Sequence, residues 1–146
     1  MKKSVFTWLL LSVFILTCTA QNYPKIERCT RINMLESPSG KVKMVLDTDT
    51  YNEVDDQFAL AYAFLSKNKI DLQAVYAAPF HNKRSEGPGD GMEKSYEEIL
   101  RLLKMLGKSP EGYAFRGSDR YLEDVSNPIR SDAALDLIKK ARASSP

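Results

Sequence analysis

Cysteine, histidine and net charge are all scarce in this chain of 146 residues. It has two cysteines and one histidine, and its 21 basic and 19 acidic side chains leave a formal net charge of +2 at pH 7. The basic residues are scattered apart from short pairs such as Lys139-Lys140. A nucleic-acid partner would need a clustered basic face, so we do not expect one. No internal repeat is found, and the length allows one modest domain.

The first twenty residues carry the pattern of a secretory signal. Two lysines open it, an apolar stretch covers residues 5–16, and Cys18-Thr19-Ala20 provides small residues for cleavage. The apolar stretch is too short for a comfortable membrane span. We therefore predict a signal peptide over residues 1–20, cut after Ala20, and a protein that works outside the cytoplasm. Lipidation at Cys18 is a weaker alternative because Thr17 fits that signal poorly.

Cleavage after Ala20 would leave Cys29 as the single cysteine. One cysteine cannot form an internal disulfide, and no metal-ligand spacing surrounds it, so we interpret it as a spectator thiol. Residues 21–40 are polar and interrupted by proline and glycine, which predicts a leader segment before a domain over residues 41–146.

Strand and helix patterns alternate through this predicted domain. The apolar run from Phe58 to Leu65 is uninterrupted, which predicts a helix buried on most sides. Residues 79–91 hold Pro88 and three glycines, which favours a long loop. The predicted elements are a strand over 41–46, a helix over 55–67, a strand over 70–78, a helix over 92–106, a short strand near 113–116 and a helix over 132–143.

This alternation predicts an α/β domain with a mostly parallel sheet flanked by helices. Two clear strands and a third short one make a thin sheet, whereas parallel sheets need helices on both faces. We therefore expect an incomplete core, corresponding to the front part of a longer protein. The sequence leaves the oligomeric state open, including a homo-oligomer.

Acidic side chains crowd the turn between the first strand and the first helix. Asp47 and Asp49 end an apolar strand, and Glu53, Asp55 and Asp56 lead into the helix. Ligands of α/β sheets bind at the carboxyl ends of the strands, and the helix N-terminus favours ionised carboxylates. A helix cap needs only one acid. The cluster therefore predicts a site for a hard cation such as Ca²⁺ or Mg²⁺, which prefers carboxylate ligands.

These residues resemble a known family. The string from Val45 to Asp49, with Asp55-Asp56 and the following Ala59-Leu60-Ala61, is similar to the opening motif of the inosine-uridine-preferring nucleoside hydrolases. The resemblance continues at 74–82 and extends more weakly to Arg116-Gly117 and the last helix. It implies a Rossmann-like core and Ca²⁺-dependent hydrolysis of the N-glycosidic bond of ribonucleosides, as in purine and pyrimidine salvage.

The resemblance also implies roles for single residues. Asp49 would ligate Ca²⁺ and take the proton from the attacking water, and Asp56 would be a second Ca²⁺ ligand. Asp55 would bind the ribose, Asn82 would lie near the water and the sugar, and Asp47 would support the site. Ca²⁺ would hold the water and the ribose hydroxyls.

Two departures from the family pattern bear on this interpretation. The acidic turn is two residues longer, so Glu53 could replace or join one of the other ligands. Family members also complete the site with a later aspartate and a histidine that acts as leaving-group acid, and neither lies in this chain. We therefore expect the chain by itself to lack turnover. His81 is the only histidine, and a spectator role is favoured over a chemical one.

Two other functions stay open. Asp47-Thr48-Asp49-Thr50 after an apolar strand also resembles the first motif of haloacid-dehalogenase-type phosphatases, with Asp47 as nucleophile and Mg²⁺ as the ion. The pair Asp55-Asp56 has no place in that scheme. A secreted, non-catalytic Ca²⁺-binding fragment is the third reading.

Overall fold

The computed structural model describes residues 25–144, which fall into two units divided between Ser37 and Pro38. The predicted signal peptide lies outside the described residues. The first unit contains a short helix, α2 (Arg28–Asn33), with every residue exposed, Cys29 included. Within residues 25–144 no helix has the length and apolar character needed to cross a membrane.

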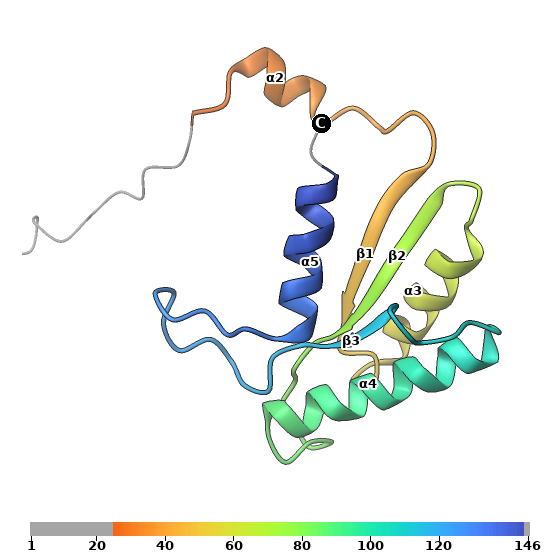
Figure 1. Cartoon of the computed structure of the whole chain (residues 1–146), viewed down its shortest axis with the longest axis vertical. Coiled ribbons are helices and arrows are strands. Elements are labelled where there is room, and N and C mark those ends of the chain that lie inside the picture. The colour runs from red at the N-terminus through yellow and green to blue at the C-terminus, as the bar shows by residue number, and fades with distance from the viewer. Residues whose placement is uncertain (1–24, 145–146) are drawn as a thin grey trace, which may run out of the picture. The chain divides into compact units, whose positions relative to one another are not determined.

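The second unit is an α/β fold with a parallel sheet, as the sequence predicted. Its three strands lie in the order β1-β2-β3, and both pairings are parallel (Figure 1). The elements are β1 (Val42–Thr48), α3 (Val54–Leu65), β2 (Ile70–Ala77), α4 (Pro88–Met105), β3 (Ala114–Arg116) and α5 (Asp132–Ala143). Three strands make a small sheet for this class, consistent with the incomplete core that was expected.

Helices cover both faces of the sheet. The larger core lies on the side of α3 and α4, and the smaller cluster lies on the side of α5 (Figure 1). The larger core contains Leu60, Leu72, Val75, Ile99 and Leu103, with Met44 and Leu46 packed against it. The smaller cluster contains Ala74, Tyr76 and Ala133, with Val45 and Phe115 packed against it. Alternate residues of β1 and β3 therefore serve opposite faces, whereas β2 departs from this alternation once, between Leu72 and Ala74.

The pairing of β1 with β2 shifts by one residue. Met44 lies opposite Leu72 and Val45 lies opposite Ala74, so Gln73 has no partner in β1. An extra residue of this kind is a β-bulge, which leaves one residue out of the ladder. Beyond the bulge Asp47 pairs with Tyr76, and both side chains lie on the α5 side of the sheet.

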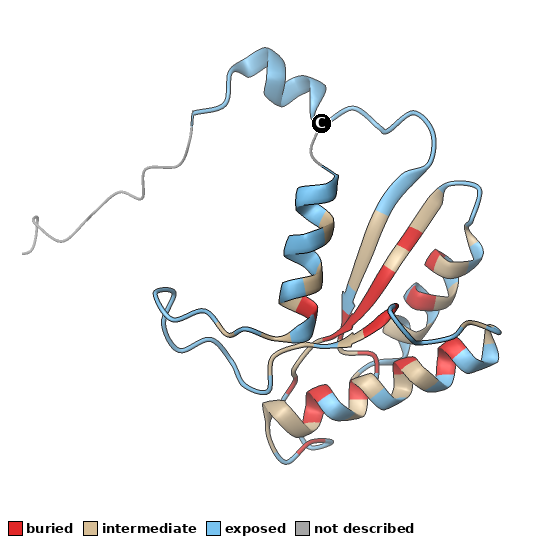
Figure 2. Ribbon diagram, in the orientation of Figure 1, coloured by how far each residue is buried: buried red, intermediate tan, exposed pale blue. Residues whose placement is uncertain are grey.

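Two sequence predictions about the helices were wrong. The prediction that α3 is buried on most sides fails, because Phe58 and Tyr62 are each 71% exposed, and only Leu60 and Ala63 are buried (Figure 2). The loop predicted over 79–91 is shorter, since α4 begins at Pro88. Proline is well tolerated in the first turn of a helix, where its missing N–H would have no partner anyway.

Candidate functional site

The acidic turn leaves the carboxyl end of β1 and enters α3 by way of two buried threonines. Thr48 and Thr50 are 3% and 0% exposed, and their hydroxyl oxygens lie 3.0 Å apart. The Thr48 hydroxyl donates its single hydrogen to the Asp56 carboxylate. Thr50 must therefore donate to Thr48, so two hydrogen bonds run in one direction from Thr50 through Thr48 to Asp56. These two hydrogen bonds fix the first turn of α3 against the end of β1.

Asp49 and Asp56 lie side by side in this turn. Burial raises the pKa of the Asp56 carboxyl, the hydrogen bond from Thr48 opposes that rise, and the nearby charge of Asp49 adds to it. None of the ion pairs within residues 25–144 involves either carboxylate. The two negative charges are therefore held together without a basic side chain to compensate them, which is costly unless a cation or a proton joins them.

Asparagine side chains connect Asp49 to the end of β2. The Asn52 side-chain amide donates to Asp49 Oδ2 at 2.9 Å, and the Asn52 carbonyl oxygen Oδ1 accepts from Asn82 Nδ2 at 2.5 Å. Asn82 follows β2, so this pair joins the loops that leave two neighbouring strands. The structure thus places Asn82 near Asp49, with Asn52 between them.

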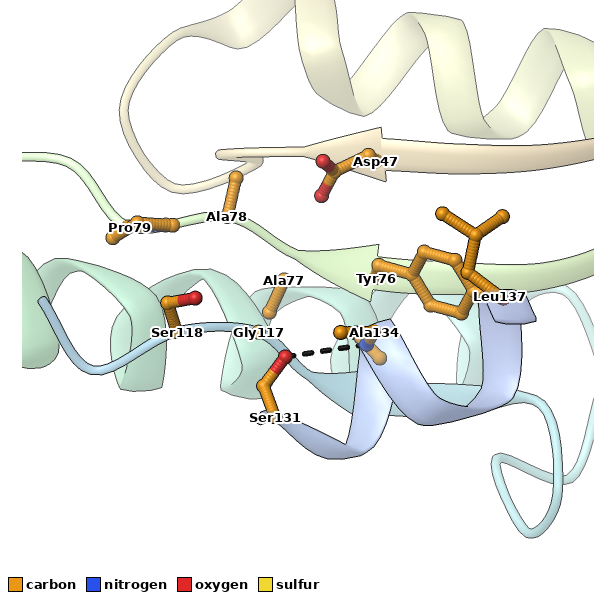
Figure 3. Close-up of a pocket in the computed structure, with 11 residues that line it drawn as sticks. Asp47, Tyr76, Ala77, Ala78, Pro79, Gly117, Ser118, Ser131, Ala134 and Leu137 are labelled. Carbon is orange, nitrogen blue, oxygen red and sulfur yellow. Dashed lines mark hydrogen bonds between the residues drawn. The ribbon is translucent and has the colours of Figure 1, made fainter. Parts of the chain in front are cut away.

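The Asp47 side chain lies on the face of the sheet that α5 covers. Its side chain points toward Tyr76 and the start of α5, into a pocket of about 190 Å³ (Figure 3). The walls of this pocket desolvate the carboxyl and raise its pKa, and the charge of Asp49 raises it further. Small side chains such as Ala77, Ala78 and Ala134 line much of the remaining wall. Asp47 is therefore a neighbour of Asp49 that belongs to a separate pocket.

The other predicted site residues lie at the rim. Glu53 precedes α3 as its N-cap residue without a side-chain capping hydrogen bond, and Asp55 is exposed in the first turn. His81 is exposed, and its side chain takes part in no hydrogen bond or ion pair found among the described residues. Across residues 25–144, no three side chains of Asp, Glu, His or Cys group closely enough to hold a metal ion by themselves.

The donor set around Asp49 still suits a hard cation in part. Asp49 and Asp56 supply two carboxylates, and the Thr48 hydroxyl oxygen contacts Asp56. Asn52 contacts Asp49 through its amide nitrogen, and Asn82 contacts Asn52 in the same way, so the hydrogen bond to the Asp49 carboxylate comes from a nitrogen and not from an amide oxygen. Ca²⁺ takes about six to eight oxygen ligands, which include neutral oxygens and water as well as carboxylates. These residues can therefore provide part of a Ca²⁺ shell, centred on two acids rather than on the four or five that the sequence suggested.

Three residues of this site were not foreseen. Thr50 and Asn52 belong to the longer turn, and Arg84 lies in the loop after β2. Its guanidinium group donates to the backbone carbonyl of Asn52 at 2.6 Å. The only signal in the sequence for Thr50 and Asn52 was their nearness to the acidic run. Arg84 had no such signal, because its contact joins two loops about thirty residues apart.

Comparison with known proteins adds no relative. None of the protein-family models, curated proteins or solved structures compared with this chain matches it. The class that the fold defines is an α/β protein with a parallel three-stranded sheet and polar side chains gathered at the carboxyl ends of β1 and β2. That is the usual place for a ligand site in such sheets.

Proposed function

We propose that this chain carries the cation- and ribose-binding part of a Ca²⁺-dependent nucleoside hydrolase, which cleaves the N-glycosidic bond of ribonucleosides to a base and ribose. The observation that carries the proposal is the pair Asp49 and Asp56, which lie side by side where β1 leads into α3, with no ion pair to either among residues 25–144. The resemblance of Asp47-Thr48-Asp49 and Asp55-Asp56 to the opening motif of that family supports the same function.

Each residue has a role in this proposal. Asp49 and Asp56 hold Ca²⁺, and Asp49 also accepts the proton of the attacking water. When bound, Ca²⁺ would supply Lewis-acid chemistry toward water and ribose hydroxyls. Asp55, exposed at the rim, accepts a hydrogen bond from the ribose, and Asn82 contacts the water or the sugar through its remaining N–H.

Carboxylates also suit the chemistry of bond cleavage. Positive charge develops on the sugar as the base leaves, and preorganised negative groups nearby stabilise that charge. In this scheme Asp47 contributes from its own pocket beside Asp49, and Glu53 is a supporting acid in the longer turn. We place the protein outside the cytoplasm, after cleavage near Ala20, with a ribonucleoside or a related ribosyl compound as its partner.

Calorimetric titration with Ca²⁺ tests the cation site. We expect the wild-type chain to bind with a dissociation constant of about 10⁻⁴ to 10⁻³ M, as extracellular Ca²⁺ modules do. Asp49→Asn and Asp56→Asn should abolish binding, whereas Glu111→Gln, which removes an equal charge from an exposed turn, should bind as the wild type does. Absence of binding by the wild type would refute the proposed site.

Substrate assays separate this function from the alternatives. We expect ribose to bind only when Ca²⁺ is present, and little base to be released from inosine or uridine by the chain alone. The leaving-group histidine of the family has no counterpart among the residues that the resemblance covers. Hydrolysis of p-nitrophenyl phosphate with Mg²⁺ would instead favour the phosphatase reading. Ca²⁺ binding without any effect of ribose would favour a non-catalytic Ca²⁺-binding protein.

A further inference from the structure

We propose that Asn52 is a positioning residue for the Asp49 carboxylate and that Arg84 holds Asn52 in place. The importance of Asp49 itself rests on the proposed function above. The residues in question lie in the longer part of the acidic turn and in the loop after β2. Neither residue has a role in the resemblance to the nucleoside hydrolases.

All four polar groups of Asn52 are engaged by the residues around the site. Its backbone N–H donates to the Asp49 carbonyl oxygen at 2.6 Å, and its side-chain Nδ2 donates to Asp49 Oδ2 at 2.9 Å. Its Oδ1 accepts from Asn82 Nδ2 at 2.5 Å, and its backbone carbonyl accepts from Arg84 Nη1 at 2.6 Å. The side-chain amide of Asn52 therefore has one favourable orientation, because a flip would bring its oxygen against a carboxylate and its nitrogen against another N–H donor.

Arg84 anchors this arrangement from the opposite loop. Its guanidinium group reaches the carbonyl of Asn52, and its backbone N–H donates to Asn82 Oδ1 at 2.9 Å. The Arg84 backbone carbonyl accepts from Lys94 at 2.8 Å, and Lys94 pairs with Asp90 at 2.7 Å within α4. A continuous set of hydrogen bonds thus runs from α4 through the loop after β2 to Asp49. Such a set limits the positions that the Asp49 carboxylate can take.

The position of the Arg84 charge is informative. The guanidinium group donates to backbone carbonyls and forms no ion pair among the described residues, so it braces the turn without neutralising Asp49 or Asp56. Asn52 occupies one oxygen of Asp49 and leaves the other for a cation or a water. Groups that orient a metal-ligating side chain in this way typically change metal affinity about 10- to 100-fold when they are removed.

Carboxyl ¹³C NMR at constant pH, without Ca²⁺, tests the positioning directly on the full chain. We expect Asn52→Ala to move the ¹³Cγ resonance of Asp49 while leaving that of Asp71 in place. Arg84→Ala should move the same Asp49 resonance by a smaller amount, and it keeps the test usable if Asn52→Ala fails to fold. Asn68→Ala is the matched control, because Asn68 is an exposed asparagine that follows the end of α3. This substitution should change neither resonance.

Calcium affinity gives the functional readout. We expect Asn52→Ala to weaken Ca²⁺ binding about tenfold or more and Arg84→Ala to weaken it less, with Asn68→Ala equal to the wild type. An Asp49 resonance unchanged in both Asn52→Ala and Arg84→Ala would overturn the inference, whatever the affinity for Ca²⁺. A moved resonance in a wild-type chain that binds no Ca²⁺ would support the positioning role and refute the proposed function.

Discussion

The hydroxyl of Tyr76 donates a 2.7 Å hydrogen bond to the Asp136 carboxylate and so joins β2 to α5. Lys140 donates to the same carboxylate oxygen at 2.5 Å, and the Tyr76 ring meets Phe115 edge to face at 5.9 Å. The apolar cluster beneath α5 is small, with Ala133 as the only buried residue of that helix. The polar contact therefore carries a substantial part of the attachment of α5 to the sheet.

Tyr76→Phe should lower the free energy of unfolding by about 1 kcal/mol, the usual net contribution of one hydrogen bond. The ring stays in place, and Asp136 keeps its pairing with Lys140. Urea denaturation followed by circular dichroism measures the change. Tyr62→Phe is the control, since the Tyr62 side chain is 71% exposed, and its free energy of unfolding should stay within about 0.5 kcal/mol of the wild type. Equal stabilities of the two variants would contradict the role given to Tyr76.

Alkaline pH should destabilise the fold through Tyr113. Burial raises the pKa of its hydroxyl from 10.0 to about 12, with a smaller contribution from the charge of Asp71, and the hydroxyl donates to the Leu72 carbonyl at 2.8 Å. Because the folded state favours the neutral phenol, this stabilisation is complete below pH 10 and is lost as the pH rises toward about 12.

The urea midpoint measured from pH 7 to pH 12 follows this loss. Tyr113→Phe should be less stable at pH 7 and should show a shallower fall above pH 10. Part of the slope should remain, because burial also raises the pKa of Tyr76. A variant whose stability falls as steeply as that of the wild type would show that Tyr113 does not contribute.

Leu60 and Phe58 lie on the buried face and the exposed face of α3. Leu60 is 0% exposed in the larger core, whereas Phe58 is 71% exposed on the other face. Leu60→Ala should lower the free energy of unfolding by about 2–5 kcal/mol because it leaves a cavity. Phe58→Ala should change it by no more than about 0.5 kcal/mol. A large loss at Phe58 would mean that its ring is covered by other parts of the protein in solution.

Gly117 lies where β2 and β3 end, and it has no room for a side chain. A Cβ atom there would lie 2.1 Å from the Ala77 carbonyl oxygen, which also accepts a 3.0 Å hydrogen bond from the Gly117 N–H. Gly117→Ala should therefore be destabilising by about 1–3 kcal/mol, the cost of overpacking. Gly87→Ala is the control, because a Cβ there meets no atom within 4 Å, and the melting temperatures of both variants decide the matter.

Local patterns predicted much of this fold. The last helix begins and ends where the sequence placed it, because Ser131 accepts a hydrogen bond from the Ala134 N–H as a true N-cap. The helix predicted over 92–106 corresponds to most of α4, in which Ile99 and Leu103 are fully buried. The exposure of Phe58 could not be predicted in this way, because an apolar pattern shows what a helix can bury and not what covers it.

The site was predictable in composition but not in arrangement. The acids were found, yet β1 continues to Thr48, so Asp47 faces α5 while the chain turns before Asp49. Asn52 and Arg84 come together only when the loops after β1 and β2 meet. Contacts of this kind depend on loop geometry, for which the sequence carries no periodic signal.

Gln73, which has no partner in β1, determines the face of the sheet on which the Tyr76 side chain lies. Leu72 before it and Val75 after it share one layer, although simple odd-and-even counting would separate them. If Gln73 took a partner and the strand ran straight, every later side chain of β2 would swap layers. The Tyr76 side chain would then lie in the larger apolar core, away from the Asp136 carboxylate, and Val75 would leave that core.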